Sequence, residues 1–335
     1  MSQSSASLIN YQIGANSYAP LQSLLAQISG RNYIVDGNFD SIISGSVAVA
    51  AGGSSNNVAT MYYGIAGATN GGTLSATWTL GYDPAGMNSP VANALTWTQS
   101  SAPTSSPSIT QRIENVQTLQ GRSATFSCWL WCASGTQTIT NIQVLQNFGT
   151  GGSPSSLVTV NAPVNWVLTT TPQRFSVLLN IPSVVGKTLG TNPNTHYLQV
   201  YVQYPASGTY AISTTQWQLE RSSPNAPVTG TPTAFDYRGV QAELARVQRY
   251  YVAPGFGSIQ CGYADVATRA IAPLAYWFPV VMRAAPTGVV STSGGVNASV
   301  GAVSTNPYGA VLGCSGIAAG YVQYSYTLTS FDARL

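Results

Sequence analysis

The stretch SATFSCWLWCA, residues 123–133, decides the fold. Apolar and polar residues alternate along it, and successive side chains of a β-strand point to opposite faces. One apolar face would hold Ala124, Phe126, Cys128, Leu130 and Cys132. The other would hold Ser123, Thr125, Ser127, Trp129 and Trp131. The stretch therefore predicts a half-buried strand with two tryptophans on its otherwise polar face.

Short segments of the same kind recur on both sides of it. They are TLSATWTLG (73–81), NALTWTQ (93–99), QRFSVLLNI (173–181), HYLQVYVQY (196–204) and YAISTTQWQLE (210–220). Turn residues separate them and no helical pattern intervenes, which favours an antiparallel sandwich over βαβ units. Strand patterns return in residues 255–335, with WFPVVM (277–282) and YVQYSYTLTSF (321–331). We predict an all-β protein with two jelly-roll-like sandwiches.

Two short helices interrupt the strand pattern. Residues 20–29 carry an apolar stripe at helical spacing, made of Leu21, Leu24, Leu25 and Ile28. Residues 239–251, GVQAELARVQRYY, carry a heptad seam made of Val240, Leu244, Val247 and Tyr251. Two heptads leave open whether this seam pairs between subunits or packs within its own chain.

These patterns divide the chain into four parts. We expect an N-terminal segment at 1–32, a large sandwich at 33–238, a helical connector at 239–254 and a small sandwich at 255–335. A ten-residue helix is marginal by itself in water, so the leucine stripe must pack on its own domain or on another protein.

Composition narrows the classes of partner. Only 6% of the 335 residues are charged and the formal net charge is +3. The cations do not cluster, so we expect no nucleic-acid partner. No apolar run reaches the roughly 18 residues of a membrane span, so we expect no membrane insertion. An uncharged surface of this kind favours an extracellular, multimeric structural protein.

Cysteines and carboxylates offer little chemistry. Cys128 and Cys132 would lie about 13 Å apart along a strand, beyond the ~7 Å limit for a disulfide. With one histidine and no CxxC pair, buried free thiols are a better interpretation than a zinc site. Nine carboxylates stand in no recognisable catalytic motif. We expect no enzymatic activity and no cofactor other than the calcium discussed next.

Several stretches resemble a family of bacteriophage and prophage tail-fibre proteins. The resemblance rests on residues 111–129, 146–156, 182–192 and above all 217–251, WQLERSSPNAPVTGTPTAFDYRGVQAELARVQRYY. Residues 279–288 and the closing SFDARL resemble the family's distal β-domain. The resemblance implies a carbohydrate-binding-like jelly roll in a trimeric fibre at the virion surface. It also implies a structural calcium between Asp40 and Glu220, with ordinary turn and capping roles as the alternative for the aspartates.

Two further expectations follow for the sites. Trp129 and Trp131 could stack on sugar rings, or a neighbouring loop or the partner sheet could cover both. Residues 1–30 lie outside the resemblance, so Leu21, Leu24, Leu25 and Ile28 are expected to attach the chain to another virion protein.

Three functions remain open from the sequence. The first is a receptor-binding tail fibre or tip that recognises host surface polysaccharide as a homotrimer, through weak contacts multiplied by avidity. The second is a head fibre or capsid decoration protein with a structural role. The third is a depolymerase. Each places the chain on the virion after assembly in the host cytoplasm.

Overall fold

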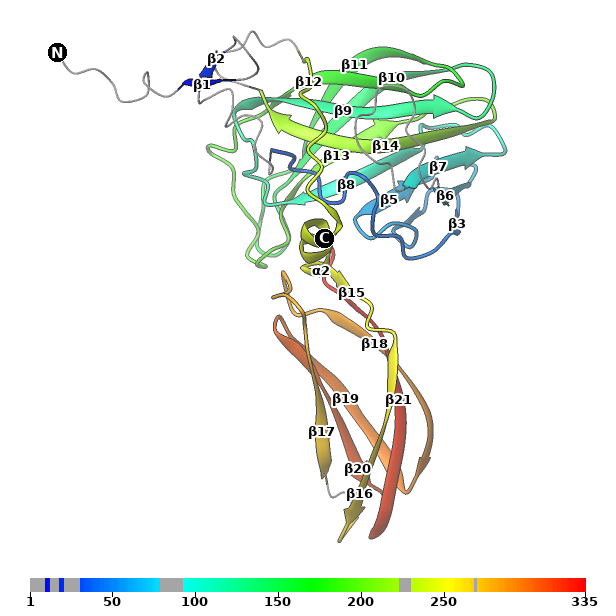
Figure 1. Ribbon diagram of the computed structural model, residues 1–335, viewed down its shortest axis with the longest axis vertical. Helices are drawn as coiled ribbons and strands as arrows, with labels where there is room; N and C mark the ends of the chain where they lie inside the picture. Colours follow the sequence, from blue (N-terminus) through cyan, green and yellow to red (C-terminus); the bar gives the residue numbers. More distant parts are fainter. Residues whose placement is uncertain (1–9, 13–17, 21–30, 79–92, 223–229, 268–269) are drawn as a thin grey trace, which may run out of the picture.

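The structure is a computed structural model that describes residues 10–12, 18–20, 31–78, 93–222, 230–267 and 270–335. Two β-sandwiches follow one another along the long axis, with the helix α2 (Val240–Gln248) between them (Figure 1). The predicted all-β fold with two sandwiches is confirmed. Within the described ranges, no helix is long and apolar enough to cross a membrane.

The large sandwich consists of two six-stranded antiparallel sheets. What we call the front sheet runs in the order β11 (Val158–Leu168), β10 (Gln137–Asn147), β13 (Tyr197–Gln203), β8 (Ser108–Glu114), β5 (Tyr62–Ile65), β4 (Ser54–Ser55). What we call the back sheet runs in the order β12 (Gln173–Ile181), β9 (Arg122–Cys132), β14 (Tyr210–Arg221), β7 (Asn93–Gln99), β6 (Gly72–Trp78), β3 (Ser46–Val49).

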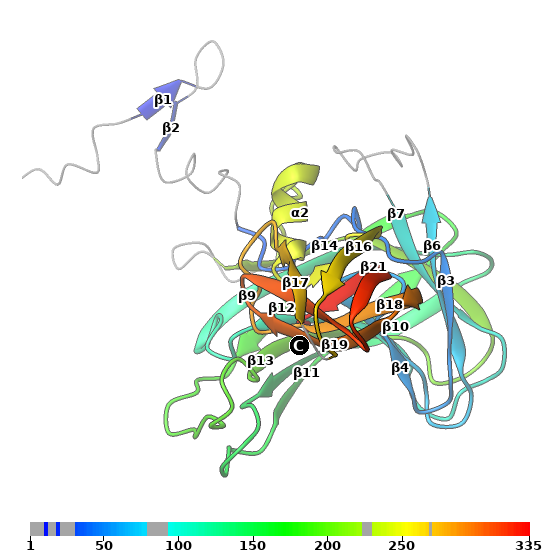
Figure 2. The ribbon, with the colours of Figure 1, turned by 90° about the horizontal axis from the view of Figure 1, so that it is seen from below.

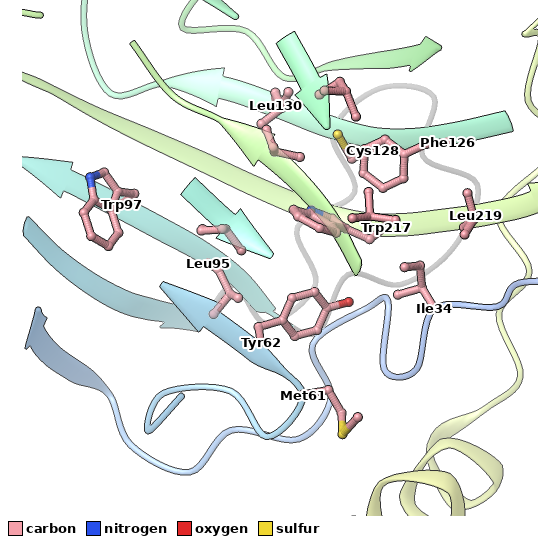
Figure 3. Close-up of a cluster of buried hydrophobic side chains, with 14 of the residues drawn as sticks. Ile34, Met61, Tyr62, Leu95, Trp97, Phe126, Cys128, Leu130, Trp217 and Leu219 are labelled. Atoms are coloured by element: carbon pink, nitrogen blue, oxygen red, sulfur yellow. The ribbon is translucent and has the colours of Figure 1, made fainter. Parts of the chain in front are cut away.

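The core of the large sandwich lies between these sheets. Strand β9 contains the stretch that the sequence singled out, and its predicted apolar face is fully buried there. Trp217 of β14 lies at the centre, with the rings of Tyr62 and Phe126 edge-on to it at 5.4 and 5.2 Å (Figure 3). Cys128 and Cys132 are buried free thiols, as predicted, and so is Cys314 of the small sandwich.

The small sandwich packs two smaller antiparallel sheets against each other. In one, β21 (Gly320–Asp332) pairs with β15 (Tyr251–Val252), β16 (Phe256–Ala264) and β18 (Thr287–Val296). In the other, β20 (Gly309–Gly316) lies between β17 (Ala270–Trp277) and β19 (Ala298–Asn306). Seen along the long axis, these strands project over the large sandwich (Figure 2).

The second predicted helix is shorter than expected, and most of the first lies outside the described residues. The second begins as expected but ends at Gln248, because Tyr251 and Val252 leave the helix to pair with Asp332 and Phe331 of β21. Near the N-terminus, β1 (Asn10–Gln12) pairs antiparallel with β2 (Tyr18–Pro20), so Pro20 is a strand residue and does not begin a helix. The rest of that predicted helix lies outside the described residues.

Candidate functional site

The outer face of the front sheet gathers amide and tyrosine side chains from four strands. Directly opposed residues of antiparallel strands point to the same face. Along β13 the inward residues Leu198, Val200 and Val202 are buried in the core, so the residues between them point outward. On β13 and along the register to β10, β11, β8 and β5, the residues of this side include Tyr197, Gln199, Tyr201, Gln203, Asn141, Gln143, Leu145, Asn147, Asn161, Thr110, Arg112, Glu114 and Tyr63. Gln199 and Thr110 among them are buried under their neighbours. We call this set the amide–tyrosine face.

Hydrogen bonds between neighbouring strands order the amides of this face. The Asn141 amide nitrogen donates to Asn161 Oδ1 at 3.1 Å and to Gln203 Oε1 at 2.8 Å. Gln143 Nε2 donates to the same Asn161 oxygen at 3.0 Å. Asn141 Oδ1 is buried and has no hydrogen-bond partner among the described residues. The row thus holds these amide groups in fixed positions on the sheet.

Aromatic rings and one guanidinium form the other half of the face. Arg112 Cζ lies 4.6 Å from the ring centre of Tyr63 and 4.7 Å from that of Tyr197, a cation–π arrangement on both sides. Burial and the neighbouring Tyr197 raise the pKa of Tyr201 to about 12, although Arg112 opposes the shift. Tyr201 therefore keeps a neutral hydroxyl that can donate as well as accept.

The charges at the edge of the face are mostly neutralised. Glu114 receives two hydrogen bonds from the guanidinium of Arg249, at 3.0 and 3.2 Å, and one from the Tyr250 hydroxyl at 3.0 Å. Arg112 is then the remaining charged residue of the amide–tyrosine face. Amide groups and rings with so little charge suit an uncharged ligand rich in hydroxyl groups.

This face is not apparent from the sequence. Its one local signal is the alternation of tyrosine and glutamine in HYLQVYVQY, residues 196–204, a pattern that by itself predicts only a strand. The other members come from four more strands, and the strand order that joins them is not readable from one sequence.

The tryptophan pair lies on the opposite sheet, where the alternation placed it. Trp129 and Trp131 form an apolar cluster of their own on the outer side of the back sheet, separate from the core. Trp129 is only 8% exposed and Trp131 is half-buried. Arg174 of β12 pairs in register with Trp129 and donates to Ser127 Oγ at 3.0 Å. Their predicted role in sugar binding stays a prediction.

The two predicted calcium ligands have different hydrogen-bond partners. Glu220 accepts hydrogen bonds from the Thr233 amide at 2.8 Å and the Thr233 hydroxyl at 2.7 Å. Asp40 accepts a hydrogen bond from the Asn38 amide nitrogen at 3.2 Å and interacts electrostatically with Glu243. In the part of the chain that the structure describes, no three Asp, Glu, His or Cys residues are grouped to hold a metal. The calcium site stays a prediction.

The predicted oligomer seam is divided between two environments. Val240 and Leu244 are 48% and 38% exposed on α2. Val247 is 2% exposed and belongs to the core of its own chain, and Tyr251 lies in β15. An interface through α2 could therefore use only the first two of these helical positions. The predicted attachment residues Leu21, Leu24, Leu25 and Ile28 lie outside the described residues.

Comparison with known proteins gives distant likenesses only. No family model matches the chain, and no curated protein does. The enzymatically active domain of tailspike protein 4 from bacteriophage CBA120 aligns with TM-score 0.34 and 11% identity, over 57% of this chain and 22% of that one. The family 22 carbohydrate-binding module of Clostridium thermocellum Xyn10B aligns with TM-score 0.33 and 11% identity, over 57% of this chain and 94% of that one.

A third likeness is of the same order. The N-terminal cellulose-binding domain of Cellulomonas fimi β-1,4-glucanase C aligns with TM-score 0.30 and 13% identity, over 45% of this chain and 89% of that one. The chain thus spans less than a quarter of the tailspike domain's length and most of the two binding modules. Scores this low assign no function, and the tail-fibre resemblance stays a prediction.

Proposed function

We propose that this chain is a virion fibre protein that binds an uncharged polysaccharide of the host surface along the amide–tyrosine face. The observation that carries the proposal is the row of ordered amides, Asn141, Gln143 and Gln203, on the same face as Tyr201. Amides can donate to and accept from neighbouring sugar hydroxyls, and tyrosine rings can cover the C–H face of a sugar. The sequence resemblance to tail-fibre proteins supports the setting in a virion.

A single such site would bind weakly. Each aromatic contact contributes on the order of 1 kcal/mol beyond the apolar area it buries. Firm attachment to a cell would then depend on several copies acting together, since linked sites gain from a high effective concentration. The proposal therefore includes a homotrimer, held to another virion protein through residues 1–30.

A binding series on the full chain tests the proposal. The chain is titrated with uncharged soluble polysaccharides (xylan, hydroxyethylcellulose, galactan) and with host cells. We expect Tyr201→Ala to weaken binding about fivefold, for a loss of about 1 kcal/mol. Tyr308→Ala is the matched control, because Tyr308 is a tyrosine of the small sandwich, 61% exposed and on none of the strands that form the face. Equal binding by both variants would contradict the proposal.

The tryptophan pair provides the internal comparison. Because Trp131 lies on the back sheet, Trp131→Ala should change the affinity less than twofold if the ligand lies on the front sheet. The opposite ranking of Tyr201→Ala and Trp131→Ala would move the site to the tryptophan pair. Antibody labelling of intact virions in the electron microscope separates a tail fibre from a head fibre or decoration protein.

A further inference from the structure

The last four residues, Asp332–Leu335, run from the small sandwich back onto the large one. Here they are called the tail. The Ala333 amide donates to the Tyr250 carbonyl at 2.8 Å, and Arg283 Nε donates to the Ala333 carbonyl at 3.0 Å. These bonds hold the tail beside the end of α2, at the junction of the two sandwiches.

Arg334 anchors the tail in the large sandwich. Its side chain is 7% exposed. It donates to the main-chain oxygen of Asn56 at 2.7 Å and lies 4.7 Å over the ring of Tyr251. Asp332 pairs with the same guanidinium at 2.6 Å. A buried guanidinium with its donors occupied in this way fixes both position and direction of the residue that follows.

That following residue reaches the amide–tyrosine face. The main-chain oxygen of Leu335 accepts hydrogen bonds from the Tyr63 hydroxyl and from Arg112 Nη1, each at 2.5 Å. Met61, Tyr63, Arg112, Arg334 and Leu335 together line a small cavity of about 10 Å³. The guanidinium of Arg112 is thus held by rings on both faces and by the tail at one edge.

We propose that the tail is a positioning element for the polysaccharide site: Leu335 holds Arg112 between Tyr63 and Tyr197, so the site is complete only when the small sandwich is docked. This inference rests on the proposed function. A long arginine side chain loses much rotamer freedom on binding, and holding it beforehand removes that cost from binding. Released from the tail, the same side chain would be free to sweep over Tyr197 and Gln199.

Two full-length variants release Arg112 in different ways. Tyr63→Phe removes only the hydroxyl that donates to Leu335, and Arg334→Ala removes the anchor of the tail. Arg122→Ala is the matched control, because Arg122 is an exposed arginine at the start of β9 on the opposite sheet. For each variant, the affinity is measured for whichever of the three polysaccharides the wild type binds most tightly. The NMR resonances of the Arg112 guanidinium are recorded as well, and they are identified by their loss in Arg112→Lys.

The expected results separate the two proposals. Both variants should weaken polysaccharide binding by about 2- to 12-fold, the usual cost of ordering one long side chain. A restrained Arg112 gives separate Nη signals, and in both variants these signals should merge, as they do when a guanidinium rotates freely. Arg122→Ala should change neither the affinity nor the Nη signals. Unchanged Nη signals, or unchanged affinity in a wild type that binds, would overturn the role of the tail. If the wild type binds no polysaccharide, the proposed function fails, and the Nη signals alone decide whether the tail holds Arg112.

Discussion

At the scale of single residues, Trp217 shows how much of the large sandwich depends on one side chain. It is fully buried, meets the rings of Tyr62 and Phe126 edge-on, and donates from Nε1 to Thr214 Oγ1 at 2.7 Å. Trp217→Ala removes these contacts and leaves a cavity, so we expect a loss of about 3–5 kcal/mol in the free energy of unfolding. Urea denaturation measures it. Trp277→Ala, at a tryptophan that is 73% exposed, should change stability by less than about 0.5 kcal/mol.

Asp36 gives a residue-scale prediction about pH. Burial raises its pKa well above the usual range, although its carboxylate accepts bonds from the amides of Asp40 and Ser41 at 2.7 and 3.0 Å. Burial also raises the pKa of Asp40. A carboxyl group with a raised pKa binds its proton more tightly in the folded state than in the unfolded state. Its favourable contribution is therefore full below about pH 4, the unfolded pKa, and is lost as pH rises through the folded pKa.

The unfolding free energy of the wild type should thus carry a component that falls over the pH interval that begins at about 4 and ends at the raised folded pKa of Asp36. Asp36→Asn removes the titrating group, and the variant should show a flatter dependence over that interval. Urea denaturation at half-unit pH steps compares the two proteins. A steeper dependence in Asp36→Asn than in the wild type would show that the burial of Asp36 is misassigned.

Single residues also show why the strand was predictable and the binding face was not. The inward and outward sets of β9 follow from alternation alone, since the side-chain period of a strand is two residues. Tyr63, Arg112, Tyr201 and Asn141 share a face only because β5, β8, β13 and β10 are neighbours in the sheet. Those strands are separated by long stretches of chain, and the sequence contains no local pattern that fixes their order.

At the scale of elements, α2 carries two kinds of apolar residue that the heptad pattern did not distinguish. Val247 is buried in the core of the large sandwich, whereas Leu244 is 38% exposed. Leu244 lines a cleft of about 390 Å³ that the helix, both sandwiches and residues 251–254 enclose. The pattern correctly predicted a helix with an apolar stripe. It could not show that β21 would pair with Tyr251 and end the helix early.

This division predicts different effects for two substitutions on the helix. Val247→Ala should lower the free energy of unfolding by about 2 kcal/mol, because two buried carbons are lost and the cavity adds to the cost. Leu244→Ala should change it by less than about 1 kcal/mol. Thermal denaturation monitored by circular dichroism ranks them. If Leu244→Ala lowers the oligomer mass in light scattering but leaves the unfolding free energy unchanged, then the exposed seam residues Val240 and Leu244 join subunits.

At the scale of the whole molecule, the small sandwich has an unusual surface. From Ala284 to Phe331 the sequence has no charged residue, and this stretch supplies β18, β19, β20 and most of β21. Exposed apolar and aromatic side chains lie on it, among them Val289, Val296, Tyr308, Ile317 and Tyr321. Natural sheets commonly protect their edge strands with charges, and β18 and β19 lack that protection. Such a surface suits burial between copies of the chain, consistent with the homotrimer that the proposed function includes.

The last prediction follows from the absence of charge. If three copies assemble through uncharged surfaces, screening by salt cannot weaken the contacts, because screening acts on charges and not on apolar burial. Light scattering on the full chain at micromolar concentration should then give a mass about three times 35.0 kDa, unchanged between low salt and about 1 M NaCl. Ile317→Asp places a charge on an exposed position of the small sandwich and should lower that mass, while Val185→Asp, at an 85% exposed position of the large sandwich, should not. A mass near 35.0 kDa for the wild type would exclude the trimer, and dissociation by salt would assign the assembly to ionic contacts elsewhere in the chain.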